Sequence, residues 1–312
     1  MGEISVIVVS WNARDYLRNC LASIRQTSNL LVQEVIVVDN ASSDGSPEMV
    51  SAEFPEVTLI RSGTNLGFAR ANNLGLHHSS GALVAFVNSD VVVHAECFQK
   101  LAGFLKNQPG TALVAPRIFG RDGQVQATCG RLPTIWNTLC EYLLLYKVFP
   151  RWRLFSGFQI RMLDPGLWAR VEVLSGCFWL TRRVAVDQVG SLDERFFFYA
   201  EDIDWCKRFR EAGWKVAFVP EATATHFGGG SSSNAPFRYS IEMLRANLLY
   251  WKKHRGSVGR SAFFVLAMLQ HFPRLVVRGI LGITGLDKGD ENKHKLTEHK
   301  VCIRWLLTGK GV

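Results

Sequence analysis

Two hydrophobic periodicities alternate along the first hundred residues. Four short apolar runs rich in β-branched residues have the character of strands buried in a parallel sheet. They occupy residues 4–9, 34–38, 57–60 and 82–87. Between them apolar residues recur at helical spacing, as at Leu17, Cys20, Leu21 and Ile24. This alternation predicts a doubly wound α/β sheet, in which ligands bind at the carboxyl ends of the strands.

The hydrophobic periodicity is irregular between residues 111 and 181. A second regular block, which overlaps the end of this stretch, runs from 171 to 226. The irregular part includes an aromatic and apolar stretch, Trp136–Phe158. The second regular part predicts a strand, a helix, a helix from about 201 to Ala212, and a final strand. A further helix is predicted over 237–255, followed by an apolar segment.

Composition narrows the class of protein. The chain has 312 residues, of which 47% are hydrophobic and 20% charged, so it can bury a sizeable core. Seven cysteines form no CxxC pair and lie among apolar neighbours, which favours buried free thiols over a disulfide framework or a zinc site. The acidic residue before the first apolar run and the polar turn after it argue against a signal peptide.

Charge is distributed unevenly between the body of the chain and its tail. Residues 1–237 carry 22 basic and 22 acidic side chains, whereas residues 238–312 carry 14 basic and 5 acidic ones. A basic tail is typical of contact with a phospholipid surface or nucleic acid, and it is also compatible with simple solubility. No RNP, helix-turn-helix or zinc pattern accompanies it, so no nucleic-acid partner is expected.

The apolar segment of the tail is interrupted by polar and charged residues. Its longest uninterrupted run is Ala262–Leu269, and Pro273, Arg274 and Arg278 follow. A spanning helix needs about 20 mainly apolar residues. The segment therefore predicts a helix lying on a membrane surface with its arginines toward headgroups. A packed core helix or a dimer helix is the alternative.

Two acidic residues close buried strands. Asp39 ends the strand at 34–38 and could accept hydrogen bonds from a base or ribose, or it could cap the following turn. Asn88, Ser89 and Asp90 follow the strand at 82–87. A carboxylate there could hold Mg²⁺ or Mn²⁺ together with substrate phosphates, although strand-end acids often only cap loops.

A third acidic group and a histidine lie further along the chain. Glu201, Asp202 and Asp204 begin a helix and follow four aromatic residues at 196–199. Acids in a first helical turn interact favourably with the helix dipole, whereas aromatic surroundings raise a carboxyl pKa toward that of a useful base. His226 ends a strand-like segment, precedes a Gly/Ser loop, and could be a metal ligand.

Seven ordered blocks resemble the family 2 glycosyltransferases, in particular their rhamnosyltransferase-like branch, over about residues 4–232. The blocks are VSWNARDYLRNCLASI, VIVVDNASSDGS, NLGFARANNLG, FVNSD, SGCFWLTRR, GSLDERFFFYAEDIDWCKRFREAG and THFGGGSS. The resemblance implies a GT-A fold with a Rossmann-like, mainly parallel sheet flanked by helices, an inverting reaction and a divalent cation, Mg²⁺ or Mn²⁺. A dinucleotide-dependent oxidoreductase would instead carry G-x-G-x-x-G where this chain reads SWNARD.

The resemblance also assigns roles to individual residues. Asp202 would be the catalytic base, with Glu201 orienting it. Asp90 and His226 would ligate the metal. The nucleotide-sugar site would be lined by Trp11, Asn12, Asp39, Asn65, Gly67, Asn72, Asn88, Ser89 and Asp90. The family's DxD motif has an acid where this chain has Asn88, which brings no charge to the metal.

These expectations define a domain plan and a function. Residues 1–236 would form the catalytic domain, with a nucleotide-binding half at about 1–115 and an acceptor half at about 116–236. Residues 237–312 would form a basic helical region. The expected activity is sugar transfer from a dTDP- or UDP-sugar to a glycan or polyprenyl-linked acceptor in cell-surface polysaccharide synthesis. The expected location is cytoplasmic, at the inner face of the membrane; an inactive nucleotide-sugar-binding relative is the alternative.

Overall fold

The structure is a computed structural model that describes residues 3–27, 31–149, 151–160, 167–228, 236–284, 286–287 and 289–310. The chain divides into two compact units. The first comprises Met1–Leu132, Gln159–Phe197 and Glu201–Ser231, and the second comprises Pro133–Phe158, Phe198–Ala200 and Ser232–Val312. The domain boundaries expected from the sequence stay a prediction.

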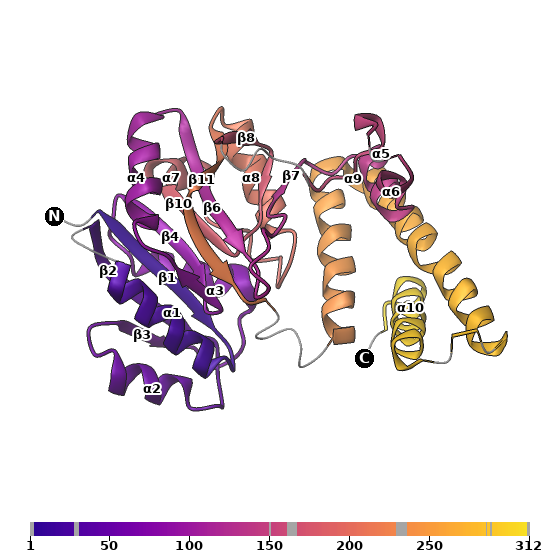
Figure 1. Ribbon diagram of the computed structural model, residues 1–312, viewed down its shortest axis with the longest axis horizontal. Helices are drawn as coiled ribbons and strands as arrows, with labels where there is room; N and C mark the ends of the chain where they lie inside the picture. Colours follow the sequence, from indigo (N-terminus) through magenta and orange to yellow (C-terminus); the bar gives the residue numbers. More distant parts are fainter. Residues whose placement is uncertain are drawn as a thin grey trace. The chain divides into compact units, whose positions relative to one another are not determined.

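The first unit is built on a nine-stranded sheet (Figure 1). Its strands are β1 (Ile4–Ser10), β2 (Val32–Asp39), β3 (Thr58–Arg61), β4 (Leu83–Asn88), β5 (Val91–Val93), β6 (Thr111–Phe119), β8 (Ala169–Val171), β10 (Phe178–Arg182) and β11 (Lys215–His226). The order is β3-β2-β1-β4-β10-β6-β11-β5, with β8 paired to β11. Strands β3, β2, β1 and β4 are parallel to one another, whereas β10 runs antiparallel between β4 and β6. The predicted α/β class with a Rossmann-like sheet is confirmed.

Helices cover both faces of this sheet. They are α1 (Arg14–Thr27), α2 (Ser46–Glu53), α3 (Gly67–His77), α4 (Cys97–Asn107), α7 (Arg183–Val189) and α8 (Glu201–Glu211). Successive strand residues serve opposite faces. Val37 packs with residues of α1, α2 and α4, whereas Ile36 and Val38 pack with α3. A two-stranded sheet of β7 (Cys129–Gly130) and β9 (Val173–Leu174) completes the unit.

The second unit is helical. It contains α5 (Ile135–Tyr142), α6 (Leu145–Val148), a 3₁₀ turn η2 (Arg153–Phe155), α9 (Pro236–Thr284) and α10 (Asp290–Thr308). Helix α9 breaks at Gly256, whose φ of 65° and ψ of −162° are not helical. The predicted helix over 237–255 therefore ends at this glycine.

All seven cysteines lie in the described part of the chain, and each is buried and free. This confirms the interpretation of the cysteine pattern as structural thiols. Burial raises the pKa of the Cys97 thiol to about 12, so the thiolate is absent at neutral pH.

Two arginines of helix α9 bind other segments of the second unit. Arg274 Nη2 donates to the Tyr142 carbonyl oxygen at 2.6 Å, and Arg278 Nη1 donates to Asn292 Oδ1 at 3.0 Å. Each guanidinium thus makes one hydrogen bond to another segment of the second unit, and the predicted membrane-surface role of this helix stays a prediction. By length and composition, Phe237–Thr284 could cross a membrane, and only 17% of its apolar window is buried.

Candidate active site

The carboxyl ends of three neighbouring parallel strands form one edge of the site. In the register of the sheet, Ser10 of β1 pairs with Asp39 of β2, and Val9 pairs with Asn88 of β4. Three polar residues from distant parts of the sequence therefore lie in a row. Their position at the carboxyl ends of the strands is where α/β sheets bind ligands.

Asp39 has one carboxylate oxygen committed to the protein and one without a partner. Oδ2 accepts a hydrogen bond from the Ser42 amide at 3.2 Å, whereas Oδ1 is buried and has no partner among the described residues. The hydroxyl of Ser10, its register neighbour, is also buried and unpartnered. Buried polar atoms are normally hydrogen-bonded, so these two atoms point to a ligand that supplies the missing partners.

The loop after β1 is tied to the loop after β2. The Asn12 amide donates to Ser42 Oγ at 2.9 Å, and Asn12 Oδ1 accepts from the Ser43 amide at 2.7 Å. Asp44 Oδ2 accepts from the Arg14 amide at the start of α1. Asn12 and the half-buried Trp11 therefore lie beside Asp39 through a connected loop pair.

Asn40 connects this edge to the start of α3. Its Nδ2 donates to Asn65 Oδ1 at 2.9 Å, its Oδ1 accepts from the Leu66 amide at 2.7 Å, and its amide donates to the Ser10 carbonyl oxygen. Asn65 Oδ1 also accepts from the Gly67 amide. Asn65 and Gly67 are thus brought to the site, held by a residue whose role the sequence interpretation missed.

Gly67 and Asn72 are fixed by packing inside the first unit. Gly67 has a φ of 77°, and a Cβ there would lie 2.4 Å from the Phe197 carbonyl oxygen, so only glycine fits. Asn72 is buried, and its Nδ2 donates to the Phe68 carbonyl oxygen within α3. The Nδ2 donor of Asn72 is therefore used within α3, whereas Oδ1 of Asp39 has no partner among the described residues.

Asp90 and His226 meet although 136 positions separate them in the sequence. Strand β5 pairs with the end of β11 so that Val91 faces His226, and the Phe227 amide donates to the Asp90 carbonyl oxygen. His226 Nε2 lies 3.2 Å from Asp90 Oδ1. Ser89, beside Asp90, is buried. Among the described residues, no group of three or more His, Cys, Asp or Glu side chains is placed to hold a metal.

The three acids of α8 have different surroundings. Asp204 is fully buried and binds Arg208 Nε at 2.9 Å, and the same guanidinium donates to the carbonyl oxygens of Val189 and Ser191. Asp204 is therefore structural. Glu201 is buried with Oε2 unpartnered, whereas Asp202 is only half-buried.

Burial changes the acidity of the Glu201–Asp202 pair. Desolvation, together with the neighbouring charges of Asp202 and Asp204, raises the pKa of Glu201 well above its usual range. Desolvation also raises the pKa of Asp202 to about 6, opposed by hydrogen bonds from the backbone amides of Ile203 and Gly176. At neutral pH, Asp202 is mainly a carboxylate of raised basicity, and it lies beside a Glu201 whose charged form is disfavoured by burial.

The backbone before this pair is strained. Tyr199 and Ala200 have φ values of 72° and 62°, in the left-handed region that non-glycine residues seldom adopt. Each such residue costs on the order of 1–3 kcal/mol. Two in succession immediately before Glu201 set the direction in which α8 starts.

A cluster of aromatic side chains packs α8 against strands β4 and β10 of the sheet. Trp205 of α8 contacts Phe86 of β4 and Trp179 of β10, with ring centroids 5.4 and 5.5 Å apart, and Trp205 Nε1 donates to the Gly190 carbonyl oxygen. Phe209, one helical turn on, contacts Trp205 at 4.9 Å. Large rings in edge and tilted contacts fix the helix rigidly on the sheet.

Two consecutive residues join the acid pair to the strand-end row. The Gly176 amide donates to Asp202, and the Cys177 carbonyl oxygen accepts from the Asn88 amide at 3.0 Å. Asp90 is close enough to raise the pKa of the buried Cys177 thiol, an effect second to desolvation. Asp90 and Asp202 therefore both lie close to the short segment Gly176–Cys177.

Comparison with known proteins decides the family. The family model described as Glycosyl transferase family 2 matches residues 5–190. The chain belongs to glycosyl transferase family 2. The predicted resemblance is confirmed, and the chain is a glycosyltransferase with the GT-A fold.

Similar proteins with known names are consistent with this family assignment. An N-acetylglucosaminyl-diphospho-decaprenol L-rhamnosyltransferase of Mycobacterium tuberculosis is 29% identical over 75% of this chain and 78% of the relative. The mannosyltransferase PcManGT of Pyrobaculum calidifontis, solved with GDP-Man and Mn²⁺, superposes with a TM-score of 0.59 at 17% identity, over 99% of this chain and 88% of the other. GalNAc-T7, solved with UDP, GalNAc and Mn²⁺, gives 0.55 at 15% identity, over 77% and 48%. The two structures share the fold.

Proposed function

We propose that this glycosyltransferase moves a sugar from a nucleoside diphosphate donor to an acceptor hydroxyl in one displacement, with inversion at the anomeric carbon. The observation that carries the proposal is the meeting of Asp90 with His226 beside a row of strand ends. Asp202 lies close to the same short segment, Gly176–Cys177, as Asp90 does. A site of this kind has a place for a charged leaving group at one end and a base at the other.

Asp39 is assigned to the nucleoside. Its unpartnered Oδ1 is an acceptor in a buried place, which suits the ring N–H of a pyrimidine. The unpartnered Ser10 hydroxyl beside it could donate to a ring carbonyl oxygen. Trp11, Asn12, Asn65 and Gly67 would border the same nucleotide.

Asp90 and His226 are assigned to a divalent cation, Mg²⁺ or Mn²⁺. The donor set fits, because one carboxylate and one imidazole nitrogen leave most positions of such an ion to phosphate and water oxygens. When bound, the cation supplies positive charge against the departing diphosphate. Asn88 and Ser89 would border the sugar and the diphosphate.

Asp202 is assigned as the base and Glu201 as its orienting neighbour. Asp202 would take the proton from the acceptor hydroxyl as the oxygen of that hydroxyl attacks the anomeric carbon. Its carboxylate is held by the Ile203 amide at 2.8 Å and stays partly accessible to an acceptor.

The donor and acceptor are proposed from the relatives and the apolar surface. The mycobacterial relative is named for L-rhamnosyl transfer to a diphospho-decaprenol glycan. We assign this chain a dTDP- or UDP-sugar, with rhamnose favoured, and a polyprenyl-diphosphate-linked glycan in cell-surface polysaccharide synthesis. An acceptor of this kind would hold the enzyme at the cytoplasmic face of the membrane.

The function is tested by ligand-induced stabilisation. Melting temperatures would be measured with a panel of dTDP-, UDP- and GDP-sugars, each with Mn²⁺ or Mg²⁺. A donor present at 100 times its Kd should stabilise the native state by about 2.7 kcal/mol and raise Tm. A pyrimidine nucleotide sugar should give the largest shift. No shift with any donor would contradict the proposed function.

The Asp39→Asn variant ties the stabilisation to the proposed site. The substitution keeps the shape but removes the charged acceptor for the base, so Kd for the nucleoside diphosphate should rise about 10- to 100-fold, as hydrogen bonds to charged groups contribute roughly 1.5–3 kcal/mol. Titration calorimetry with dTDP measures this. Asp187→Asn, an exposed position on α7, is the matched control. Unchanged affinity for dTDP in Asp39→Asn would remove Asp39 from the site.

The second half of α9 is assigned to the membrane surface. Its exposed apolar residues recur at helical spacing without a charged residue among them: Val265, Leu269, Phe272, Val276, Ile280 and Ile283. Such a stripe is typical of a helix lying in the interface plane, with the surrounding basic charge attracting anionic lipids.

The membrane assignment predicts the effect of a double substitution. Leu269→Glu with Phe272→Glu should lower partitioning to anionic vesicles at least tenfold, because burying each side chain contributes about 1.5–3 kcal/mol. Sedimentation with vesicles measures the partitioning. Met243→Glu, exposed on the first half of α9, is the control and should bind as the wild type does. Equal partitioning of the double variant and the wild type would exclude this stripe as the membrane-binding surface.

A further inference from the structure

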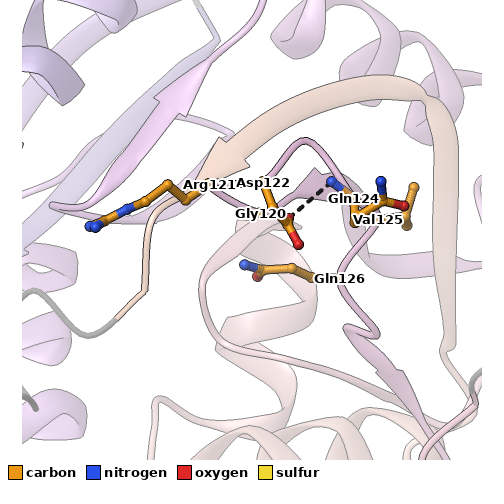
Figure 2. Close-up of a pocket in the computed structure, with 6 residues that line it drawn as sticks. All are labelled: Gly120, Arg121, Asp122, Gln124, Val125 and Gln126. Atoms are coloured by element: carbon orange, nitrogen blue, oxygen red, sulfur yellow. Dashed lines mark hydrogen bonds between the residues drawn. The ribbon is translucent and has the colours of Figure 1, made fainter.

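The loop between β6 and β7 is closed on itself by backbone hydrogen bonds. Figure 2 shows its six residues, Gly120, Arg121, Asp122, Gln124, Val125 and Gln126, around an open hollow of about 410 Å³. The Gly120 amide donates to the Gln124 carbonyl oxygen at 2.7 Å, and the Gln126 amide donates to the Ile118 carbonyl oxygen at 2.8 Å. The backbone of Gln126 is therefore fixed to the end of β6.

The side chain of Gln126 binds His226 at two points. Its Nε2 donates to the His226 carbonyl oxygen at 3.0 Å, and its Oε1 lies 3.1 Å from His226 Nδ1. The orientation of the amide follows from chemistry, because a backbone carbonyl can only accept and must face the NH₂ group. Oε1 therefore faces Nδ1, and an amide oxygen can only accept from it.

This pair of contacts fixes the tautomer of His226. Nδ1 must carry the proton that Gln126 Oε1 accepts, so in the neutral ring the lone pair is on Nε2. Nε2 is the nitrogen that lies 3.2 Å from Asp90 Oδ1. Partners that hold the second ring nitrogen of a histidine orient the first one toward a metal and raise its basicity.

We propose that Gln126 is a positioning residue for the metal site, setting the tautomer and ring orientation of His226 so that Nε2 faces the cation held with Asp90. The proposal rests on the proposed function, which places a divalent cation on this pair. Gln126 touches neither substrate nor cation; it acts through His226.

Two neighbours show that the loop is built around this contact. A Cβ on Gly120 would lie 2.8 Å from Asp122 Oδ1 and 3.2 Å from Gln126 Nε2, so a larger residue there would press on the amide. Arg121 Nη2 donates to the Tyr16 hydroxyl at 2.7 Å, and its guanidinium lies 6.0 Å from the ring of Phe227, the residue after His226. The loop thus also contacts the residue that follows His226 in the chain.

Three variants separate positioning from simple loop packing. Gln126→Leu removes both hydrogen bonds at similar size. Gln126→Glu keeps an acceptor for Nδ1–H, loses the donor to the His226 carbonyl oxygen and adds a negative charge. Gln124→Leu changes an exposed glutamine of the same loop and is the matched control. Melting temperature without metal reports whether each variant folds as the wild type does.

Mn²⁺ affinity in the presence of saturating dTDP is the main readout, measured from the electron paramagnetic resonance signal of free Mn²⁺. Gln126→Leu should raise Kd for Mn²⁺ about 10- to 100-fold at unchanged Tm. Gln126→Glu should recover most of the affinity, and Gln124→Leu should match the wild type. Coupling of bound Mn²⁺ to an imidazole nitrogen should be present in the wild type and weakened in Gln126→Leu.

The outcomes also separate this proposal from the one it rests on. Wild-type protein that binds Mn²⁺, with Gln126→Leu binding equally well, overturns the positioning role alone. A Gln126→Glu variant that binds Mn²⁺ as weakly as Gln126→Leu also overturns the positioning role, because it shows that the acceptor for Nδ1 is irrelevant. Wild-type protein that fails to bind Mn²⁺ with dTDP overturns the cation assignment itself.

Discussion

Replacing Asp202 with asparagine should lower kcat by a factor of about 100 or more, since a positioned general base contributes roughly 10²- to 10⁴-fold. The amide keeps the size of the side chain but cannot take a proton. Donor affinity should stay within a few-fold of the wild type, because the proposed nucleotide contacts lie at the strand ends. Initial rates with a nucleotide-sugar donor and titration with dTDP measure the two quantities.

The same assignment fixes the direction of the pH dependence. With the pKa of Asp202 raised to about 6, the carboxylate is the major form above pH 6 and the acid below it. Only the carboxylate accepts a proton, so kcat/KM should rise as the pH increases through about 6. This limb should be absent from the residual activity of Asp202→Asn.

Controls on the same helix test whether the loss is specific. Glu211→Gln, exposed at the far end of α8, should keep wild-type turnover. Glu201→Gln should lose less than Asp202→Asn, because Glu201 is assigned an orienting role and burial already disfavours its charged form. Near-normal turnover in Asp202→Asn would eliminate it as the base.

Much of the site could be predicted because strand ends are visible in a sequence. Runs of apolar residues locate buried strands, and parallel strands bring their carboxyl ends to one edge. Asp39 and Asn88 end two such runs, and Asp90 lies two residues after Asn88. The sheet places the first two on either side of β1. The predicted strand at 34–38 lies within β2, and the one at 82–87 overlaps β4 over residues 83–87.

Contacts between side chains distant in sequence could not be predicted in this way. Gln126 and His226 are 100 positions apart, and no local pattern reports a hydrogen bond between them. Asn40 follows Asp39 directly, yet its role in holding Asn65 depends on how two loops meet. Gly176 was quoted within a family block without a role, and only the fold brings its amide to Asp202.

The contacts of charged side chains on α9 could not be predicted from the sequence either. Arg274 and Arg278 were expected to face lipid headgroups, because charge on an apolar helix suggests an interface. Each donates one hydrogen bond to another segment of the second unit, and the exposed stripe of the helix is apolar throughout. Helical periodicity tells which residues share a face but not which face is covered by α5 and α10.

Replacing Asp90 with asparagine should lower metal-dependent transfer by roughly 10²- to 10³-fold, the loss typical of removing one group that stabilises developing negative charge. Asp90 is the only carboxylate of the proposed pair, and Asn88 brings no charge of its own. The amide keeps the shape of the side chain, so the melting temperature should change little. Initial rates over a range of Mn²⁺ concentrations measure the loss, and EDTA should abolish wild-type activity until excess Mn²⁺ restores it.

A substitution at Asn88 tests the same metal site by adding a charge instead of removing one. Asn88→Asp adds a carboxylate at the end of β4, where the family motif carries its first acid. It should tighten Mn²⁺ binding, because a second negative oxygen ligand attracts a hard cation more strongly than an amide does. The double variant Asn88→Asp with Asp90→Asn keeps the charge of the wild type but moves it by two residues. It should stay impaired, since His226 Nε2 lies 3.2 Å from Asp90 itself. Full wild-type activity in EDTA, or full activity of Asp90→Asn, would exclude this pair from the chemistry.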